Sequence, residues 1–138
     1  MIVSTKGRYA LRVMVSFAQR GREEYIPLKE IAEAEHISQK YLESIMTTLS
    51  KADFVDAVHG KGGGYRLNRA PERYTIGSIL KLTEGSLAAV SCTEQGPAAC
   101  SRATCCQAKP MWDKLDAIID DFFEGITLKD MLTMSDAK

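Results

Sequence analysis

The stretch PLKEIAEAEHISQKYLESIMTTLSK, residues 27–51, decides the fold of this chain. Pro27 opens a helix of about two turns, and Ser38 is a good N-cap for a second helix over residues 39–51. Between the two helices the apolar Ile37 is expected to lie buried in a tight turn. Two short helices joined in this way are typical of a helix-turn-helix.

The second helix of this pair has an apolar face and a polar face. Its apolar residues recur at helical spacing and are expected to face a core: Leu42, Ile45, Met46 and Leu49. Its outer face presents side chains that can form hydrogen bonds with base edges: Gln39, Lys40, Glu43 and Thr47. A solvated face on any three-helix core would show the same pattern, so this helix alone leaves both interpretations open.

A glycine-dense turn follows the helix-turn-helix. Residues 54–58 and 65–67 alternate as strands do, and the six residues between them include four glycines. Glycine allows positive φ and close backbone approach to a partner, and Lys61 at the tip can meet a phosphate. A hairpin directly after a helix-turn-helix is the winged-helix arrangement. The turn fits neither the phosphate-binding loop nor the dinucleotide fingerprint, which disfavours a nucleotide site.

Composition and charge limit the classes to which the chain can belong. The 138 residues are 45% hydrophobic, enough for one domain with a real core. Residues 1–69 carry 11 Lys/Arg against 8 Asp/Glu, and residues 70–138 carry 7 against 10, as expected if only the front half meets a polyanion. No apolar run of about 18 residues and no secretory signal is present, so we expect a cytoplasmic protein that does not contact a membrane.

Helical spacing and capping residues predict four more helices, over residues 5–20, 76–84, 111–124 and 128–134. Thr5, Thr75 and Thr127 are the expected N-caps of the first, second and fourth. We therefore expect a mainly α fold with a small β-hairpin. A winged helix-turn-helix DNA-binding domain would span residues 1–74, and residues 75–138 would hold a sensor loop and a long dimerisation helix.

The helix over residues 111–124 carries an apolar stripe. Its members fall at alternating a and d positions of a heptad: Trp112, Leu115, Ile119, Phe122 and Ile126. Such a stripe needs a partner, which is either the N-terminal helix or a second subunit. Helix-turn-helix proteins commonly bind two half-sites as symmetric dimers, so we expect the stripe to form a homodimer interface.

All four cysteines lie between Cys92 and Cys106, in a segment rich in turn formers. Cytoplasmic thiols stay reduced, so such a cluster is more typical of a ligand set or a redox site than of a disulfide framework. We interpret residues 92–106 as a loop that holds a metal or iron–sulfur cofactor, whose state the rest of the chain converts into DNA binding. The same half of the chain has no histidine to activate a cysteine, so we do not expect an enzyme.

Three other interpretations of this loop stay open. A zinc site from four thiolates lacks the usual C-x2-C pairs, and the adjacent Cys105 and Cys106 are awkward for a tetrahedron. A cluster-free regulator could use the thiols as a disulfide switch. An iron–sulfur or metal carrier without DNA binding would leave the wing unexplained.

Four motifs occur together in this chain: the helix-turn-helix PLKEIAEAEHISQKYLESIMTTL, the wing VHGKGGGYRL, the helix start TIGSI, and a cysteine loop before W-x-x-L. In this combination they resemble the IscR/NsrR/CymR family of bacterial winged-helix transcriptional regulators, over nearly the whole chain. The resemblance implies a homodimer crossed through its long helix and palindromic double-stranded operator DNA. It also implies that, in the sensing members, a 2Fe–2S or 4Fe–4S cluster controls DNA affinity.

Carried over by position, the resemblance implies a set of DNA-contacting residues. The recognition helix would contribute Ser38, Gln39, Lys40, Tyr41 and Glu43. The wing would contribute His59, Lys61, Gly62, Gly63 and Gly64. Lys6 and Tyr9 would contact phosphate. Several relatives have arginine where this chain has His59, and a mostly neutral histidine enters a minor groove less strongly.

The resemblance also implies three cluster ligands, which by position are Cys92, Cys100 and Cys106, with Cys105 as an extra thiol. Iron–sulfur clusters generally have four protein ligands. Where relatives supply the fourth ligand, this chain has Lys109 and Arg8, neither of which is a credible iron ligand. The fourth ligand would then be Cys105, an oxygen such as that of Glu94, or absent, which would leave an open site.

Overall fold

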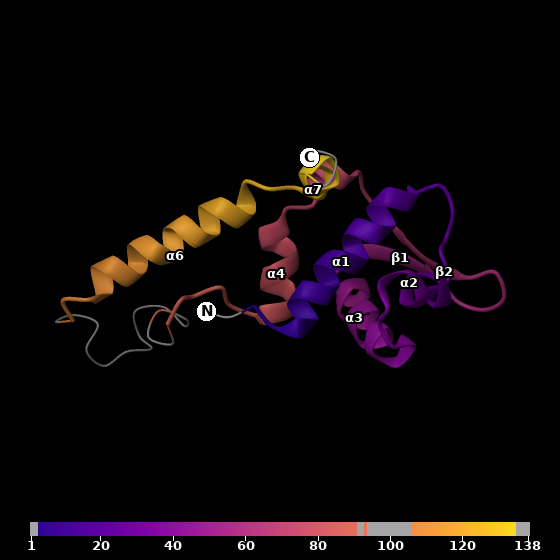
Figure 1. Cartoon of the computed structure of the whole chain (residues 1–138), viewed down its shortest axis with the longest axis horizontal. Helices are drawn as coiled ribbons and strands as arrows, with labels where there is room; N and C mark the ends of the chain where they lie inside the picture. Colours follow the sequence, from indigo (N-terminus) through magenta and orange to yellow (C-terminus); the bar gives the residue numbers. More distant parts are fainter. Residues whose placement is uncertain (1–2, 91–92, 94–105, 135–138) are drawn as a thin grey trace.

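In a computed structural model of the chain, the structure describes residues 3–90, 93 and 106–134. The first half contains α1 (Thr5–Arg20), α2 (Leu28–Glu35), α3 (Gln39–Lys51), β1 (Val55–Val58) and β2 (Gly64–Leu67). The second half contains the 3-10 turn η1 (Pro71–Arg73), α4 (Ile76–Glu84), α6 (Lys109–Glu124) and α7 (Leu128–Met134). The expected mainly helical fold with one small hairpin is confirmed (Figure 1).

Helix α1 lies at the centre of the body and contacts α2, α4, α7 and β2. Its residues Val13, Met14 and Phe17 are fully buried. One apolar cluster joins them to α3, the hairpin, α4 and α7, and it includes Tyr74 and Leu128. The core is therefore continuous across residue 74, and the division into residues 1–74 and 75–138 remains a proposal about function.

Most helix starts follow from the capping residues in the sequence. The hydroxyl groups of Ser38 and Thr75 accept hydrogen bonds from the backbone at the starts of α3 and α4, as expected. In α1 the N-cap is Ser4, whose hydroxyl accepts from the N–H of Gly7 at 3.1 Å, so the expectation of Thr5 was wrong by one residue. Two neighbouring hydroxyl residues compete for this role, and sequence alone does not rank them.

The turn between α2 and α3 is the predicted tight connection. His36 adopts a left-handed conformation with φ of 56°, and its N–H bonds to the carbonyl of Ala32. Ile37 is 6% exposed and belongs to the core. The inward face of α3, residues Leu42, Ile45, Met46 and Leu49, is buried as expected. The helix-turn-helix therefore has the geometry that residues 27–51 predicted.

The hairpin β1–β2 is antiparallel, with Val55 opposite Leu67 and Val58 opposite Gly64. The loop before α2 adds a short third rung, because Ile26 and Tyr65 exchange two backbone hydrogen bonds of 2.8 and 2.9 Å. A methyl group on Gly64 would overlap the carbonyl of Ile26. This glycine is thus needed for a close approach within the chain itself.

Helix α6 extends away from the body as an arm, on the side opposite the wing (Figure 1). None of its residues is buried, and its C-terminal part forms ion pairs with α4. There Lys81 pairs with Asp120 at 2.5 Å and with Glu124 at 3.2 Å, and Glu124 also accepts a hydrogen bond of 3.1 Å from the hydroxyl of Thr75. Among the described helices, none is long and apolar enough to cross a membrane.

Candidate nucleic-acid interface

The exposed face of α3 carries the residues expected to contact DNA. Ser38, Gln39, Lys40 and Glu43 are exposed, and Tyr41 is half-buried. Because the opposite face of α3 is fully packed, these side chains have a rigid support. Such an exposed second helix can enter a major groove with its N-terminal residues against base edges.

Lys6, Tyr9 and Tyr41 lie together where α1 meets α3. The rings of Tyr9 and Tyr41 meet edge to face with centroids 5.8 Å apart, and the guanidinium of Arg12 lies 5.1 Å from the Tyr9 ring. The ammonium of Lys6 donates a hydrogen bond of 3.0 Å to the hydroxyl of Thr48 on α3. The structure therefore brings Tyr41 of the predicted recognition helix together with Lys6 and Tyr9, the residues predicted to contact phosphate. It also adds Thr48, which the sequence did not single out.

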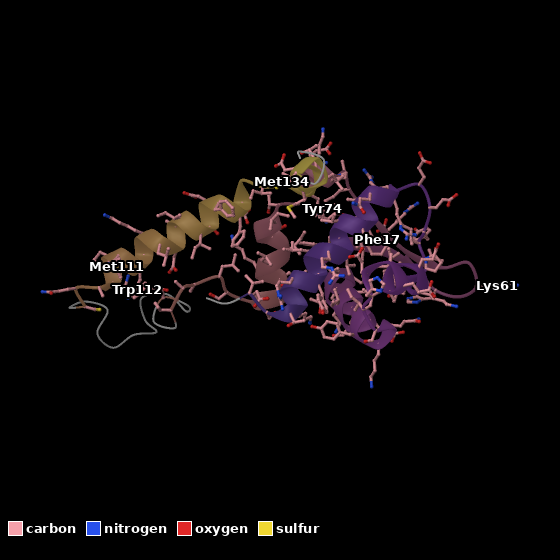
Figure 2. All side chains as sticks on the ribbon, in the orientation of Figure 1. Phe17, Lys61, Tyr74, Met111, Trp112 and Met134 are labelled. Atoms are coloured by element: carbon pink, nitrogen blue, oxygen red, sulfur yellow. The ribbon has the colours of Figure 1, made fainter. Side chains whose placement is uncertain are left out.

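Lys61 lies at the far tip of the wing, at the end of the molecule opposite Met111 and Trp112 (Figure 2). His59, Lys61 and Gly62 are exposed. Gly63 and Gly64 are half-buried, and their close approach is to the backbone of Val58 and Ile26. The tip can meet a polyanion, whereas these last two glycines serve the fold of the wing.

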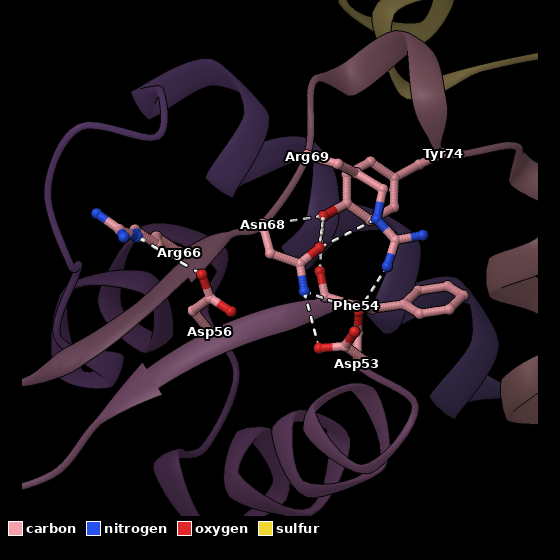
Figure 3. Close-up of polar contacts among 7 residues, drawn as sticks. All are labelled: Asp53, Phe54, Asp56, Arg66, Asn68, Arg69 and Tyr74. Carbon is pink, nitrogen blue, oxygen red and sulfur yellow. Dashed lines mark hydrogen bonds and ion pairs between the residues drawn. The ribbon is translucent and has the colours of Figure 1, made fainter.

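The second strand of the wing carries a cation that sequence reasoning missed. The guanidinium of Arg66 lies 4.3 Å from the ring of Tyr25 and 3.9 Å from Asp56 (Figure 3). The sequence alone does not show that Arg66 faces Asp56, because this pairing depends on the register of the hairpin. The Arg66 side chain is about one-third exposed.

The base of the wing is closed by a buried tyrosine. Tyr74 is 1% exposed, and its hydroxyl lies between the backbones of Phe54 and Asn68 (Figure 3). Burial raises the pKa of Tyr74, so the phenol stays protonated and keeps its hydrogen to donate. Asn68 and Arg69 both donate hydrogen bonds to the carbonyl of Asp53, so these residues form one polar cluster beside Tyr74.

The predicted cluster ligands lie mostly outside the described residues. Cys92, Cys100 and Cys105 are among the undescribed positions, as is Glu94. Cys106 is described; it is half-buried and lies just before α6. Within the described ranges no group of three His, Cys, Asp or Glu side chains could hold a metal.

The two positions of the expected fourth ligand hold hydrogen-bond donors. Lys109 donates to Asp113 at 2.7 Å, and Arg8 donates to Thr5 at 3.2 Å. Neither side chain offers a lone pair to iron while it is charged. Neither of these two positions therefore supplies a fourth cluster ligand in this chain.

The apolar stripe of α6 divides into two faces. Ile119 and Ile126 pack against the core of their own chain, and Trp112 is half-buried. Leu115 and Phe122 are 37% and 61% exposed. They line up with two more exposed apolar residues, Met111 and Ile118. The structure therefore packs one part of the stripe against its own chain and leaves the other part exposed.

A groove on the outer face of α1 is also apolar. It has a volume of about 540 Å³, with Leu11, Val15 and Met131 among its lining residues. Arg12 closes one side of the groove through an ion pair of 3.2 Å with Glu35. Leu11 is half-buried at the edge of this groove.

A model of the Rrf2 family, described as iron-dependent transcriptional regulators, matches residues 3–134. The chain belongs to the Rrf2 family. Among its curated relatives, the HTH-type transcriptional regulator IscR of Vibrio parahaemolyticus is 36% identical over 133 residues, which cover 96% of this chain and 78% of that protein.

Two solved structures resemble this Rrf2 protein along most of its length. T. potens IscR has 35% identity and a TM-score of 0.77, with 98% of this chain and 88% of that chain covered. CymR (YrzC), the global cysteine regulator of B. subtilis, has 30% identity and a TM-score of 0.78, with 97% and 98% covered. The chain is therefore a helix-turn-helix transcriptional regulator, a class that acts by binding DNA and not as an enzyme. The family resemblance seen in the sequence is confirmed.

Proposed function

We propose that this Rrf2 protein is a homodimer that binds palindromic DNA and whose affinity is controlled by an iron–sulfur cluster in residues 92–106. One observation carries the proposal: the cysteine-bearing segment directly joins α4, which packs on the DNA-binding body, to the arm α6, which leaves it (Figure 1). A change in that segment therefore acts on one element of the body and on the arm at the same time.

For DNA contact we propose the exposed face of α3 in the major groove and the wing tip on the backbone. Base contacts come from Ser38, Gln39, Lys40, Tyr41 and Glu43. Phosphate contacts come from Lys6, Tyr9 and Lys61, with His59 and the wing glycines beside them. The exposure of α3 and of the wing tip supports this assignment. The Lys6 ammonium has three N–H donors, so it can keep its hydrogen bond with Thr48 and still donate to a phosphate oxygen.

For the homodimer we propose that the exposed stripe of one arm enters the α1 groove of a second copy. The stripe (Met111, Leu115, Ile118 and Phe122) is apolar, and so is the floor of the groove. Four large apolar side chains exposed along one helix are unusual for a monomer and typical of an interface. In a symmetric dimer each arm would cross to the partner, which would hold two recognition helices about 34–36 Å apart for successive major grooves.

For the cofactor we propose Cys92, Cys100 and Cys106 as ligands, with Cys105 as a neighbouring thiol. Bound iron would draw three thiolates together and so order the segment between α4 and α6. A position without a fourth thiolate would admit a small oxidant or ligand. The description of the family as iron-dependent supports iron over zinc.

A second candidate is a cluster-free regulator with a thiol switch. The likeness of this chain to CymR, a global cysteine regulator, favours this alternative. In such a protein, oxidation of two thiols to a disulfide would order the same segment without a metal. The adjacent pair Cys105 and Cys106 would then matter as much as Cys92 and Cys100.

Anaerobic purification distinguishes the two candidates. The cluster predicts brown protein with iron and acid-labile sulfide, and DNA affinity that changes when the cluster is removed by a chelator. Cys92→Ala, Cys100→Ala and Cys106→Ala should each remove the colour, and Cys105→Ala is the matched control that should keep it. Colourless protein with stoichiometric zinc would overturn the cluster. Colourless, metal-free protein whose DNA affinity changes with diamide would support the thiol switch.

A further inference from the structure

The hydroxyl group of Tyr74 extends the strand ladder at the base of the wing (Figure 3). Since Val55 lies opposite Leu67, Phe54 and Asn68 are the next partners in register. The N–H of Asn68 donates to the Tyr74 hydroxyl at 3.1 Å, and this hydroxyl donates to the carbonyl of Phe54 at 2.7 Å. A side-chain oxygen thus joins the two backbones where the hairpin leaves the body.

Arg69 packs on the ring of Tyr74 and holds it in this position. Its guanidinium lies 4.9 Å from the Tyr74 ring and 5.3 Å from the Phe54 ring, and it donates a hydrogen bond of 2.5 Å to the carbonyl of Asp53. The amide of Asn68 donates to the same carbonyl at 2.7 Å. Asp53 and Phe54, before β1, and Asn68 and Arg69, after β2, are therefore held together around the ring of Tyr74.

The backbone of Tyr74 is tied to the opposite half of the protein. Its carbonyl accepts a hydrogen bond of 3.0 Å from the N–H of Leu128, the first residue of α7. The next residue, Thr75, is the N-cap of α4 and bonds to Glu124 on the arm. Tyr74 therefore joins the wing to the elements that carry α4, α6 and α7.

The wing is sensitive to small changes at this base. Each of its strands has four residues, and the tip around Lys61 is exposed. Besides its base, it is held by the backbone pair of Ile26 and Tyr65 and by Arg66, which lies on the Tyr25 ring. At about 3.3 Å per residue the tip lies roughly 15 Å from the base, so a 10° tilt moves it by roughly 2–3 Å. Such a shift is enough to lose a phosphate contact.

We propose that Tyr74 is a positioning residue for DNA binding: its hydroxyl, held by Arg69, sets the direction of the wing and so the place where Lys61 and His59 meet the DNA. The inference rests on the proposed assignment of the wing tip to DNA. Tyr74 itself touches no DNA, because it is buried, and its whole effect on affinity passes through the tip.

A double-mutant cycle tests this claim. The probe is one fluorescein-labelled duplex, selected with the wild-type protein from a randomised library, and affinity is measured by anisotropy. Tyr74→Phe should weaken binding roughly five- to tenfold in the wild-type background. In a Lys61→Ala/His59→Ala background the same change should weaken binding less than about twofold, because the tip no longer contributes. Equal losses in both backgrounds, or no loss in the wild type, would overturn the proposal.

Two further variants keep the test independent of stability. Ile79→Val, in the fully buried face of α4, is the matched control, because it lowers the melting temperature without touching the wing base and should leave affinity unchanged. A loss of affinity in this control equal to that of Tyr74→Phe would overturn the proposal. If Tyr74→Phe does not fold, Arg69→Lys replaces it in the cycle. This change keeps the positive charge but removes the planar guanidinium that lies over the Tyr74 ring, and it should show the same background dependence.

The wing-tip variant also tests the assignment of the tip to DNA separately from the role of Tyr74. If Lys61→Ala/His59→Ala binds the duplex as tightly as the wild type, the assignment of the tip to DNA fails, and the proposal for Tyr74 fails with it. If the tip variant weakens binding but the cycle is additive, only the proposal for Tyr74 fails.

Discussion

The ammonium of Lys81 lies 2.5 Å from a carboxylate oxygen of Asp120, and this pair joins α4 to the arm α6. Glu124 adds a second carboxylate at 3.2 Å. The hydrogen bond with Asp120 is the largest cause that raises the pKa of Lys81 above its ordinary value of 10.5. One cation therefore joins two carboxylates of the arm to the body.

Lys81→Met should loosen the arm and lower the free energy of unfolding by about 0–1 kcal/mol, since the side chain is 43% exposed and screened by solvent. A raised pKa means that the stabilisation is complete below pH 10.5 and is lost as the pH rises through the higher folded value. The difference in unfolding free energy between wild type and variant should therefore shrink at alkaline pH and in high salt. A difference that stays constant from pH 8 to the alkaline limit would contradict the ion pair.

Gly64→Ala should destabilise the wing more than Gly62→Ala. A methyl group at Gly64 would overlap the backbone carbonyl of Ile26, which cannot move without breaking the bonds between Ile26 and Tyr65. At Gly62 the space is open, and the cost is that of a positive φ, about 1–2 kcal/mol. Chemical denaturation of the two variants measures the order. A smaller loss for Gly64→Ala would show that the loop before α2 is not fixed to the wing.

The residues that the sequence located correctly are those whose role is local. Ser38 and Thr75 cap helices through bonds to the adjacent turn, and Ile37 is buried by the turn that contains it. Local capping chemistry and period are visible in one sequence, so the elements of the fold could be predicted from it.

The roles that the sequence did not show depend on contacts between distant elements. Ile119 and Ile126 pack against the core of their own chain whereas Phe122 is exposed, and the heptad pattern alone does not separate them. Tyr74 could not be singled out, because its role depends on the register that places Phe54 beside Asn68. Such roles can be recognised only in the three-dimensional structure, whatever the residue types.

Phe122→Glu should convert the protein into a monomer. The side chain is 61% exposed, so a charge there costs the single chain little, but it would be buried without a partner in the proposed interface. Sedimentation equilibrium should show a dimer for the wild type and a monomer for the variant. Val58→Glu, an exposed apolar position on the wing, is the matched control and should remain dimeric. A dimeric Phe122→Glu protein would place the interface elsewhere.

Lys61→Ala should weaken DNA binding and lower its dependence on salt. Each phosphate contact releases condensed counterions, so removal of one lysine contact should reduce the slope of log K against log salt by about 0.9 per subunit. Because a phosphate carries no sequence information, the loss should be similar for the selected duplex and for an unrelated one. Lys129→Ala on α7, an exposed lysine outside the proposed surface, is the matched control and should leave the slope unchanged. An unchanged slope for Lys61→Ala would remove the wing tip from the DNA interface, whereas a loss confined to the selected duplex would make Lys61 a base-reading residue.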